Sequence, residues 1–105
     1  MQYGLKDETL EAIKTVISRH YEVEQAILYG SRAKGNFKEA SDIDLVLTGK
    51  ELDTSILSKI HWQLDDLLLP YFIDLAIYHH IDNPQLIEHI NRVGKIIYQK
   101  NKTHN

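Results

Sequence analysis

The sequence contains no cysteine and only two prolines. Without cysteine the chain can form no disulfide, no thiolate zinc site, no iron–sulfur cluster and no cysteine nucleophile. Positive charge is not in excess either, because 12 basic residues stand against 15 acidic ones, for a formal charge of −3. A wide basic surface is therefore not expected, and we predict no direct contact with nucleic acid.

Long apolar runs and a signal-peptide pattern are also missing, the first residues being MQYGLKDETLEAIK. These absences predict a cytoplasmic protein with no membrane contact. Hydrophobic residues make up 43% of the 105 residues and charged residues 26%, as in an ordinary globular protein. That length supplies one core, so we predict a single domain over residues 1–105, with a polar tail from about residue 99.

Apolar periodicity predicts three helices and four strands. The predicted helices cover residues 7–20, 53–69 and 84–93, and the predicted strands cover residues 23–29, 42–48, 71–78 and 95–98. Residues 31–41 are small and charged, which predicts a loop that opens with a helical turn. The predicted fold class is α+β, a small mixed β-sheet with helices packed on one face.

Three aspartates are the candidate catalytic and metal-binding residues. Side chains alternate across a strand, so Asp42 and Asp44 point to one face, with bases about 7 Å apart. If the aliphatic residues of both central strands face the helices, Asp74 in the next strand shares that face. Carboxylates so placed can bind magnesium, and three on one open face suit metal-assisted phosphoryl transfer with two cations.

The dipeptide Gly30-Ser31 ends the preceding strand, with ten residues between it and Asp42. Glycine lets the backbone approach a ligand closely, and the following amides with the serine hydroxyl can cradle phosphate. Arg32 adds positive charge beside the turn, which favours a phosphate contact for it as well. The segment matches neither the Walker loop nor the GxGxxG turn, so P-loop and Rossmann sites lack support.

The stretch GSRAKGNFKEASDIDLVL, with Asp74 in FIDLAIY, resembles the active-site signature of the DNA polymerase β-like nucleotidyltransferase superfamily. Given its length, the chain most resembles the minimal nucleotidyltransferases, the MNT-type antitoxins of prokaryotes. Lys34 stands where that family usually carries arginine, which keeps the charge but loses a bidentate phosphate contact. The resemblance implies a polymerase β-like nucleotidyltransferase fold.

The resemblance also implies an activity. Gly30 and Ser31 would hold the triphosphate of ATP, and Asp42 and Asp44 would hold two Mg²⁺ ions that bridge it. Asp74 would help bind the metal beside the acceptor hydroxyl and assist its deprotonation. In related proteins AMP passes to a tyrosine of a partner HEPN-domain toxin, a ribonuclease, and silences it. The expected assembly is therefore a hetero-oligomer with such a toxin.

Two other functions stay open. The chain could be a binding module that neutralises a toxin by contact alone, although such a module has no need of clustered carboxylates. It could also transfer a nucleotide to a small molecule or RNA, but larger superfamily members use extra domains for those acceptors. We expect a partner to approach along residues 32–37 and 78–80, which would flank the aspartates.

Overall fold

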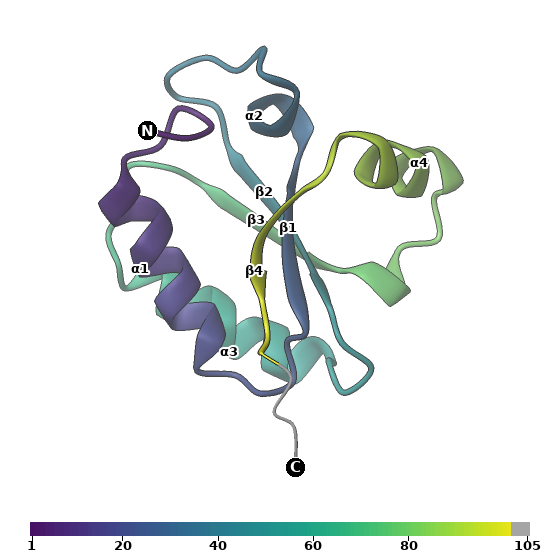
Figure 1. Cartoon of the computed structure of the whole chain (residues 1–105). Helices are drawn as coiled ribbons and strands as arrows, with labels where there is room; N and C mark the ends of the chain where they lie inside the picture. Colours follow the sequence, from purple (N-terminus) through teal and green to yellow (C-terminus); the bar gives the residue numbers. More distant parts are fainter. Residues whose placement is uncertain (102–105) are drawn as a thin grey trace.

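The computed structural model describes residues 1–101. Helices and strands alternate along most of that range (Figure 1). The elements in chain order are α1 (Asp7–Ser18), β1 (Gln25–Tyr29), α2 (Gly30–Lys34), β2 (Ile43–Thr48), α3 (Thr54–Asp65), β3 (Ile73–Ile77), a 3₁₀ turn (Tyr78–His80), α4 (Pro84–Val93) and β4 (Lys95–Gln99).

The four strands form one mixed sheet in the order β3-β2-β1-β4. β1 pairs antiparallel with β2 and with β4, whereas β2 and β3 run parallel. A parallel pair needs a crossover connection, and α3 supplies it between these two strands. The mixed sheet predicted from the sequence is therefore confirmed.

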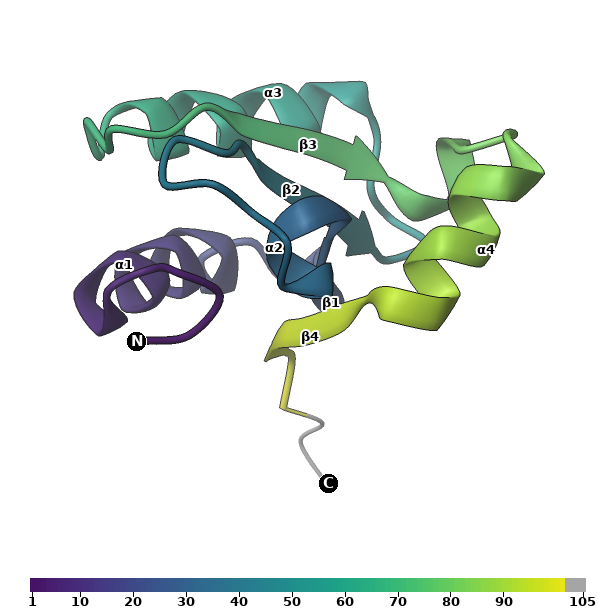
Figure 2. The same ribbon diagram turned by 90° about the horizontal axis from the view of Figure 1, so that it is seen from above.

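Helices α1 and α3 cover one face of this sheet, as predicted. Their buried residues, including Ile13 and Ile60 at 0% exposed, pack against Leu28, Leu45 and Leu47 of the central strands. Helix α4 lies on the opposite side of the sheet from α1 (Figure 2). It packs there on part of the second face, in a smaller cluster of Tyr29, Val46 and Ile90. The second face is thus covered at one end only.

Capping residues account for the helix starts that the sequence predicts. The Asp53 side chain accepts a hydrogen bond of 2.9 Å from the Ile56 amide, and Asn83 caps α4 with Pro84 as its first residue. The predicted end of α3 at residue 69 is wrong, because α3 ends at Asp65. Leu68 then adopts a left-handed backbone with φ 54°, which turns the chain towards β3.

The C-terminal segment forms hydrogen bonds beyond residue 99, where the sequence predicts a polar tail. The Lys100 amide donates to the carbonyl oxygen of Glu24 at 2.8 Å, and its ammonium donates to that of Tyr21 at 2.9 Å. Residues 102–105 of the predicted tail lie outside the described range. Within residues 1–101, every helix is too short or too polar to cross a membrane.

Candidate active site

A row of three polar side chains crosses the second sheet face, running from the α4 cluster to its uncovered end. The register pairs Tyr29 of β1 with Asp44 of β2, and Asp44 with Asp74 of β3. Directly paired residues point to the same face of a sheet, so these three side chains lie side by side. The structure therefore brings Asp44 and Asp74 together on one face, as the alternation pattern predicts. We call this surface the carboxylate face.

Asp42 lies immediately before β2, which starts one residue later than predicted. Its side chain is exposed, and its charge acts on Asp44. The next residue is held in place, because the Ile43 amide donates to the carbonyl oxygen of Phe72 at 2.9 Å. All three predicted carboxylates thus lie at the end of the sheet where the parallel strands β2 and β3 begin.

The glycine of the Gly30-Ser31 turn is required by the close approach of a carboxylate. Gly30 has φ +74°, a conformation that side chains rarely adopt, and it lies where β1 passes into α2. A Cβ atom at this position would collide with Oδ2 of Asp44. The turn and the carboxylate face therefore form one continuous surface, with Ser31 next in the chain.

Uncompensated negative charge dominates this surface. Burial raises the pKa of Asp44, the charges of Asp74 and Asp42 raise it further, and His89 acts in the opposite direction. Burial, Asp74 and Asp44 together raise the pKa of Tyr29 to about 12, so its phenol keeps its proton at neutral pH. Within residues 1–101 none of the three aspartates forms an ion pair.

The donor set fits a hard divalent cation that the substrate helps to ligate. No group of three or more possible ligands in residues 1–101 is already gathered around a common point. Magnesium does not require such a group, since one or two carboxylates together with water and phosphate oxygens complete its shell. Asp42, Asp44 and Asp74 supply only oxygen donors, and a cation between them would relieve the repulsion that raises the pKa of Asp44.

His89 belongs to the site, although sequence reasoning missed it. Its Nε2 accepts a hydrogen bond of 3.0 Å from the Gly30 amide, and its ring meets the Tyr29 ring edge-on at 6.2 Å between centroids. It lies on α4 directly before the buried Ile90. Its place next to a buried residue of this helix is the signal by which the sequence could have indicated it. His79 and His80, which are adjacent in the sequence, are exposed in the turn after β3.

The prediction that Arg32 contacts the nucleotide needs correction. Its side chain is only 1% exposed, and its guanidinium hydrogen-bonds to three main-chain carbonyl oxygens inside the fold. A group so enclosed cannot reach a ligand on the carboxylate face. Lys34, by contrast, is exposed at the end of α2.

Replacing Asp44 with asparagine should stabilise the protein at pH 7. The pKa of Asp44 is raised in the folded state, so its ionisation opposes folding above that pKa. As the pH falls through the raised pKa towards the ordinary value, the unsubstituted domain should regain this stability, and Asp44→Asn should not. Melting temperatures of both proteins between pH 4 and pH 7 test this without metal. A variant less stable than the parent at pH 7 would contradict it.

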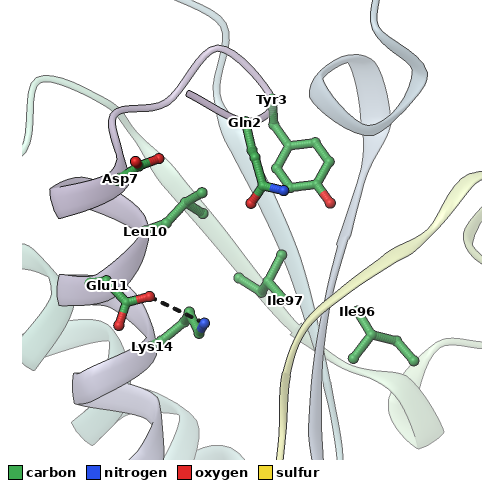
Figure 3. A pocket seen from close by; sticks show the side chains of 8 residues that line it. All are labelled: Gln2, Tyr3, Asp7, Leu10, Glu11, Lys14, Ile96 and Ile97. Carbon is green, nitrogen blue, oxygen red and sulfur yellow. Dashed lines mark hydrogen bonds and ion pairs between the residues drawn. The ribbon is translucent and has the colours of Figure 1, made fainter.

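A hollow of about 450 Å³ lies elsewhere, between the N-terminal turn, α1 and β4 (Figure 3). Its charged walls are already paired in part, since Lys14 bonds Glu11 at 3.2 Å. None of the three aspartates lines it. The candidate site is therefore the carboxylate face with the Gly30-Ser31 turn.

Comparison with known proteins finds matches to the sequence over most of its length. The model of the family "Polymerase beta, Nucleotidyltransferase" matches residues 11–103. The probable protein adenylyltransferase MntA of Haemophilus influenzae is 29% identical over 103 residues, covering 97% of this chain and 90% of the relative. The family match spans both the Gly-Ser turn and all three aspartates.

Solved structures share the fold. A toxin–antitoxin structure with AMP-PNP contains a chain that matches with a TM-score of 0.69 at 18% identity, over 91% of this chain and 75% of that one. The complex of tri-AMPylated Shewanella oneidensis HEPN toxin with MNT antitoxin matches with a TM-score of 0.68 at 16% identity, over 91% and 74%. At these identities the likeness concerns the fold alone.

Proposed function

Because this chain belongs to the polymerase beta nucleotidyltransferase family, we propose that it transfers AMP from ATP to a hydroxyl group, most simply a tyrosine, of a HEPN-type toxin. The observation that carries the proposal is the side-by-side register of Asp44 and Asp74 next to the Gly30-Ser31 turn. The choice of acceptor rests on similar proteins, of which one is named a probable protein adenylyltransferase and another has a solved structure in complex with a tri-AMPylated HEPN toxin.

The nucleotide end of the site is the Gly30-Ser31 turn. The Ser31 hydroxyl and nearby amides would bind the phosphates, while Gly30 permits the chain to pass close to Asp44. Asp42 and Asp44 would hold Mg²⁺, two ions in the full proposal, with the phosphate oxygens completing the shell. Bound Mg²⁺ supplies neutralisation of the charge that develops on the phosphate oxygens.

Asp74 serves the acceptor end. The acceptor hydroxyl oxygen forms a bond to the α-phosphorus of ATP, the bond from that phosphorus to the pyrophosphate oxygen breaks, and pyrophosphate leaves. The proton of the hydroxyl passes to the Asp74 carboxylate, which is exposed and can receive it. Tyr29 remains protonated at neutral pH and cannot serve as this base.

We propose an approach of the partner that differs from the one expected from the sequence. Asp74 lies near the start of β3, and residues 78–80 follow its far end, about 15 Å away by strand rise. Phe37, the apolar residue of the 32–37 segment, packs on the Arg32 guanidinium. Phe72 is 62% exposed and shares the face of Asp74 two residues earlier. We therefore place the acceptor beside Phe72.

A second candidate function is toxin neutralisation by contact, without transfer. The unpaired aspartates disfavour it, because a binding surface gains nothing from carboxylates that repel one another. Transfer to a small molecule or RNA is the other alternative. The mass of the partner after reaction distinguishes all three.

Co-expression with the product of the neighbouring gene should yield a stable complex, and incubation with ATP and Mg²⁺ should add one or more AMP masses to the partner. A specific contact should bury at least about 1,000 Å². A pull-down followed by intact-mass measurement tests both points, and omission of Mg²⁺ is the control. Association without a mass shift would favour the binding module. Neither association nor shift would favour a small-molecule or RNA acceptor.

A further inference from the structure

Arg32 is a charged side chain enclosed by the main chain. Its side chain is 1% exposed, and within residues 1–101 it is the one buried residue that is polar or charged. Its Nε and Nη2 donate to the carbonyl oxygen of Ser41 at 3.1 and 2.9 Å, Nη2 donates to that of Glu39 at 3.0 Å, and Nη1 donates to that of Tyr3 at 2.9 Å. No carboxylate within residues 1–101 pairs with it.

The three carbonyls come from two segments that are separate in the sequence, the N-terminal turn and the loop before β2. Arg32 itself is two residues after Gly30 in α2. Ser41 directly precedes Asp42, so a fork of two hydrogen bonds holds the peptide group that carries the Asp42 amide. Tyr3 belongs to the N-terminal turn, which lies beside the loop after α2 (Figure 1). The guanidinium thus connects the helix that starts at the Gly30-Ser31 turn, the loop that leads to Asp42, and the N-terminal turn.

Two aromatic rings complete the enclosure. The guanidinium carbon lies 5.2 Å from the ring centroid of Phe37 and 4.9 Å from that of Tyr71. A planar guanidinium that contacts two rings and donates through a fork is a geometry that arginine provides and lysine does not. The arrangement therefore depends on arginine and not merely on positive charge.

The N-terminal turn is shaped to reach this group. Gln2 and Leu5 exchange two main-chain hydrogen bonds of 3.2 and 2.8 Å, and Tyr3 and Gly4 between them have φ values of 57° and 72°. A Cβ atom on Gly4 would collide with the Phe37 ring and lie 2.9 Å from Nη1 of Arg32. Gly4 therefore permits the contact in which Tyr3 accepts from Arg32.

We infer that Arg32 is a positioning residue which fixes Asp42 relative to the Gly30-Ser31 turn, and that the N-terminal turn 2–5 is part of the same device. Asp42 needs such support because it lies outside β2, whose strand pairing begins only at Ile43. The inference rests on the proposed function for its purpose, which is to hold a metal-binding carboxylate at a set place. Its structural content does not depend on which acceptor is used.

Amide hydrogen exchange tests the inference without any activity. The reporters are the amides of Lys38 and Ser41, which donate to the Ser41 hydroxyl at 2.8 Å and to the Lys38 carbonyl at 3.0 Å. Arg32→Lys and Gly4→Ala should both raise exchange in residues 36–42, while the amides of β1 and β2 stay protected. The control is Ile60→Val in α3, which loosens the core away from Arg32 and its hydrogen-bond partners. Unchanged exchange in residues 36–42 in both variants would overturn the inference.

Metal dependence gives a second measurement. The melting temperature is followed against Mg²⁺ concentration with a non-hydrolysable ATP analogue present. Gly4→Ala should need about tenfold more Mg²⁺ for half of the stabilisation, as loss of groups that support a metal ligand typically costs 10- to 100-fold in affinity. Ile60→Val should lower the melting temperature without this change, and equal Mg²⁺ dependence in Gly4→Ala and Ile60→Val would count against the inference. If the parent shows no Mg²⁺-dependent stabilisation, the proposed function fails and hydrogen exchange alone decides this inference.

Discussion

Replacing Asp42 and Asp44 together with asparagine should lower AMP transfer by at least about 10³-fold, with the domain still folded. The substitution keeps side-chain size but removes two negative charges from the carboxylate face, and loss of a single electrostatic stabiliser in an active site already costs about 10²–10³-fold. Stability should not fall, because ionised Asp44 is opposed by Asp74 and Asp42 in the unsubstituted chain. Transfer is measured as the AMP mass gained by the partner with time.

The matched control is the double change Asp65→Asn with Asp66→Asn. It removes the same charge from the exposed end of α3, which covers the other face of the sheet. This control should transfer AMP at the parental rate. Full transfer by the Asp42 and Asp44 variant, or tight binding of ATP without Mg²⁺, would overturn the assignment of these residues.

The sequence predicts the carboxylate face because strand periodicity is a local property. Side chains alternate, so Asp42 and Asp44 share a face, and Asp74 joins them once the aliphatic residues of β3 face the helices. The covering of that face by α4 was not predicted, since the sequence gives no register between a helix and a distant sheet. His89 was missed for this reason, as it meets Gly30 from 59 positions away.

For Arg32 the local sequence predicts a role that the structure does not support. Its neighbours in the sequence, Gly30 and Ser31, indicate phosphate binding, and a positive charge beside them favours the same role. The structure instead encloses the side chain, because the carbonyls of Tyr3, Glu39 and Ser41 lie close enough to accept four hydrogen bonds from it. Burial and hydrogen-bond partners depend on long-range packing, which a local motif does not encode.

Replacing Asp74 with asparagine should lower the rate of transfer by about 10²–10⁴-fold and change ATP binding much less, since loss of general-base assistance has that magnitude. Asp74 of β3 lies opposite Asp44 of β2. The exposed Phe72, beside which we place the acceptor, lies two residues before Asp74, so Asp74 is on the acceptor side of the carboxylate face. The nucleotide contacts of Gly30 and Ser31 are untouched by the change. Single-turnover transfer rates and ATP titrations in Mg²⁺ measure the two effects separately.

The pH dependence separates a base from a structural carboxylate. If Asp74 accepts the proton, the parental rate should fall in acid, and the residual rate of Asp74→Asn should lose that dependence. The control is Asp82→Asn, an exposed acidic residue in the segment before α4, which should keep both the rate and the pH profile. A variant of Asp74 that loses stability but retains the parental rate would assign this carboxylate to the fold instead. Its neighbour Asp44 has a raised pKa and so responds to proton concentration as well, which is why the comparison is made between the two rate profiles and not from the parent alone.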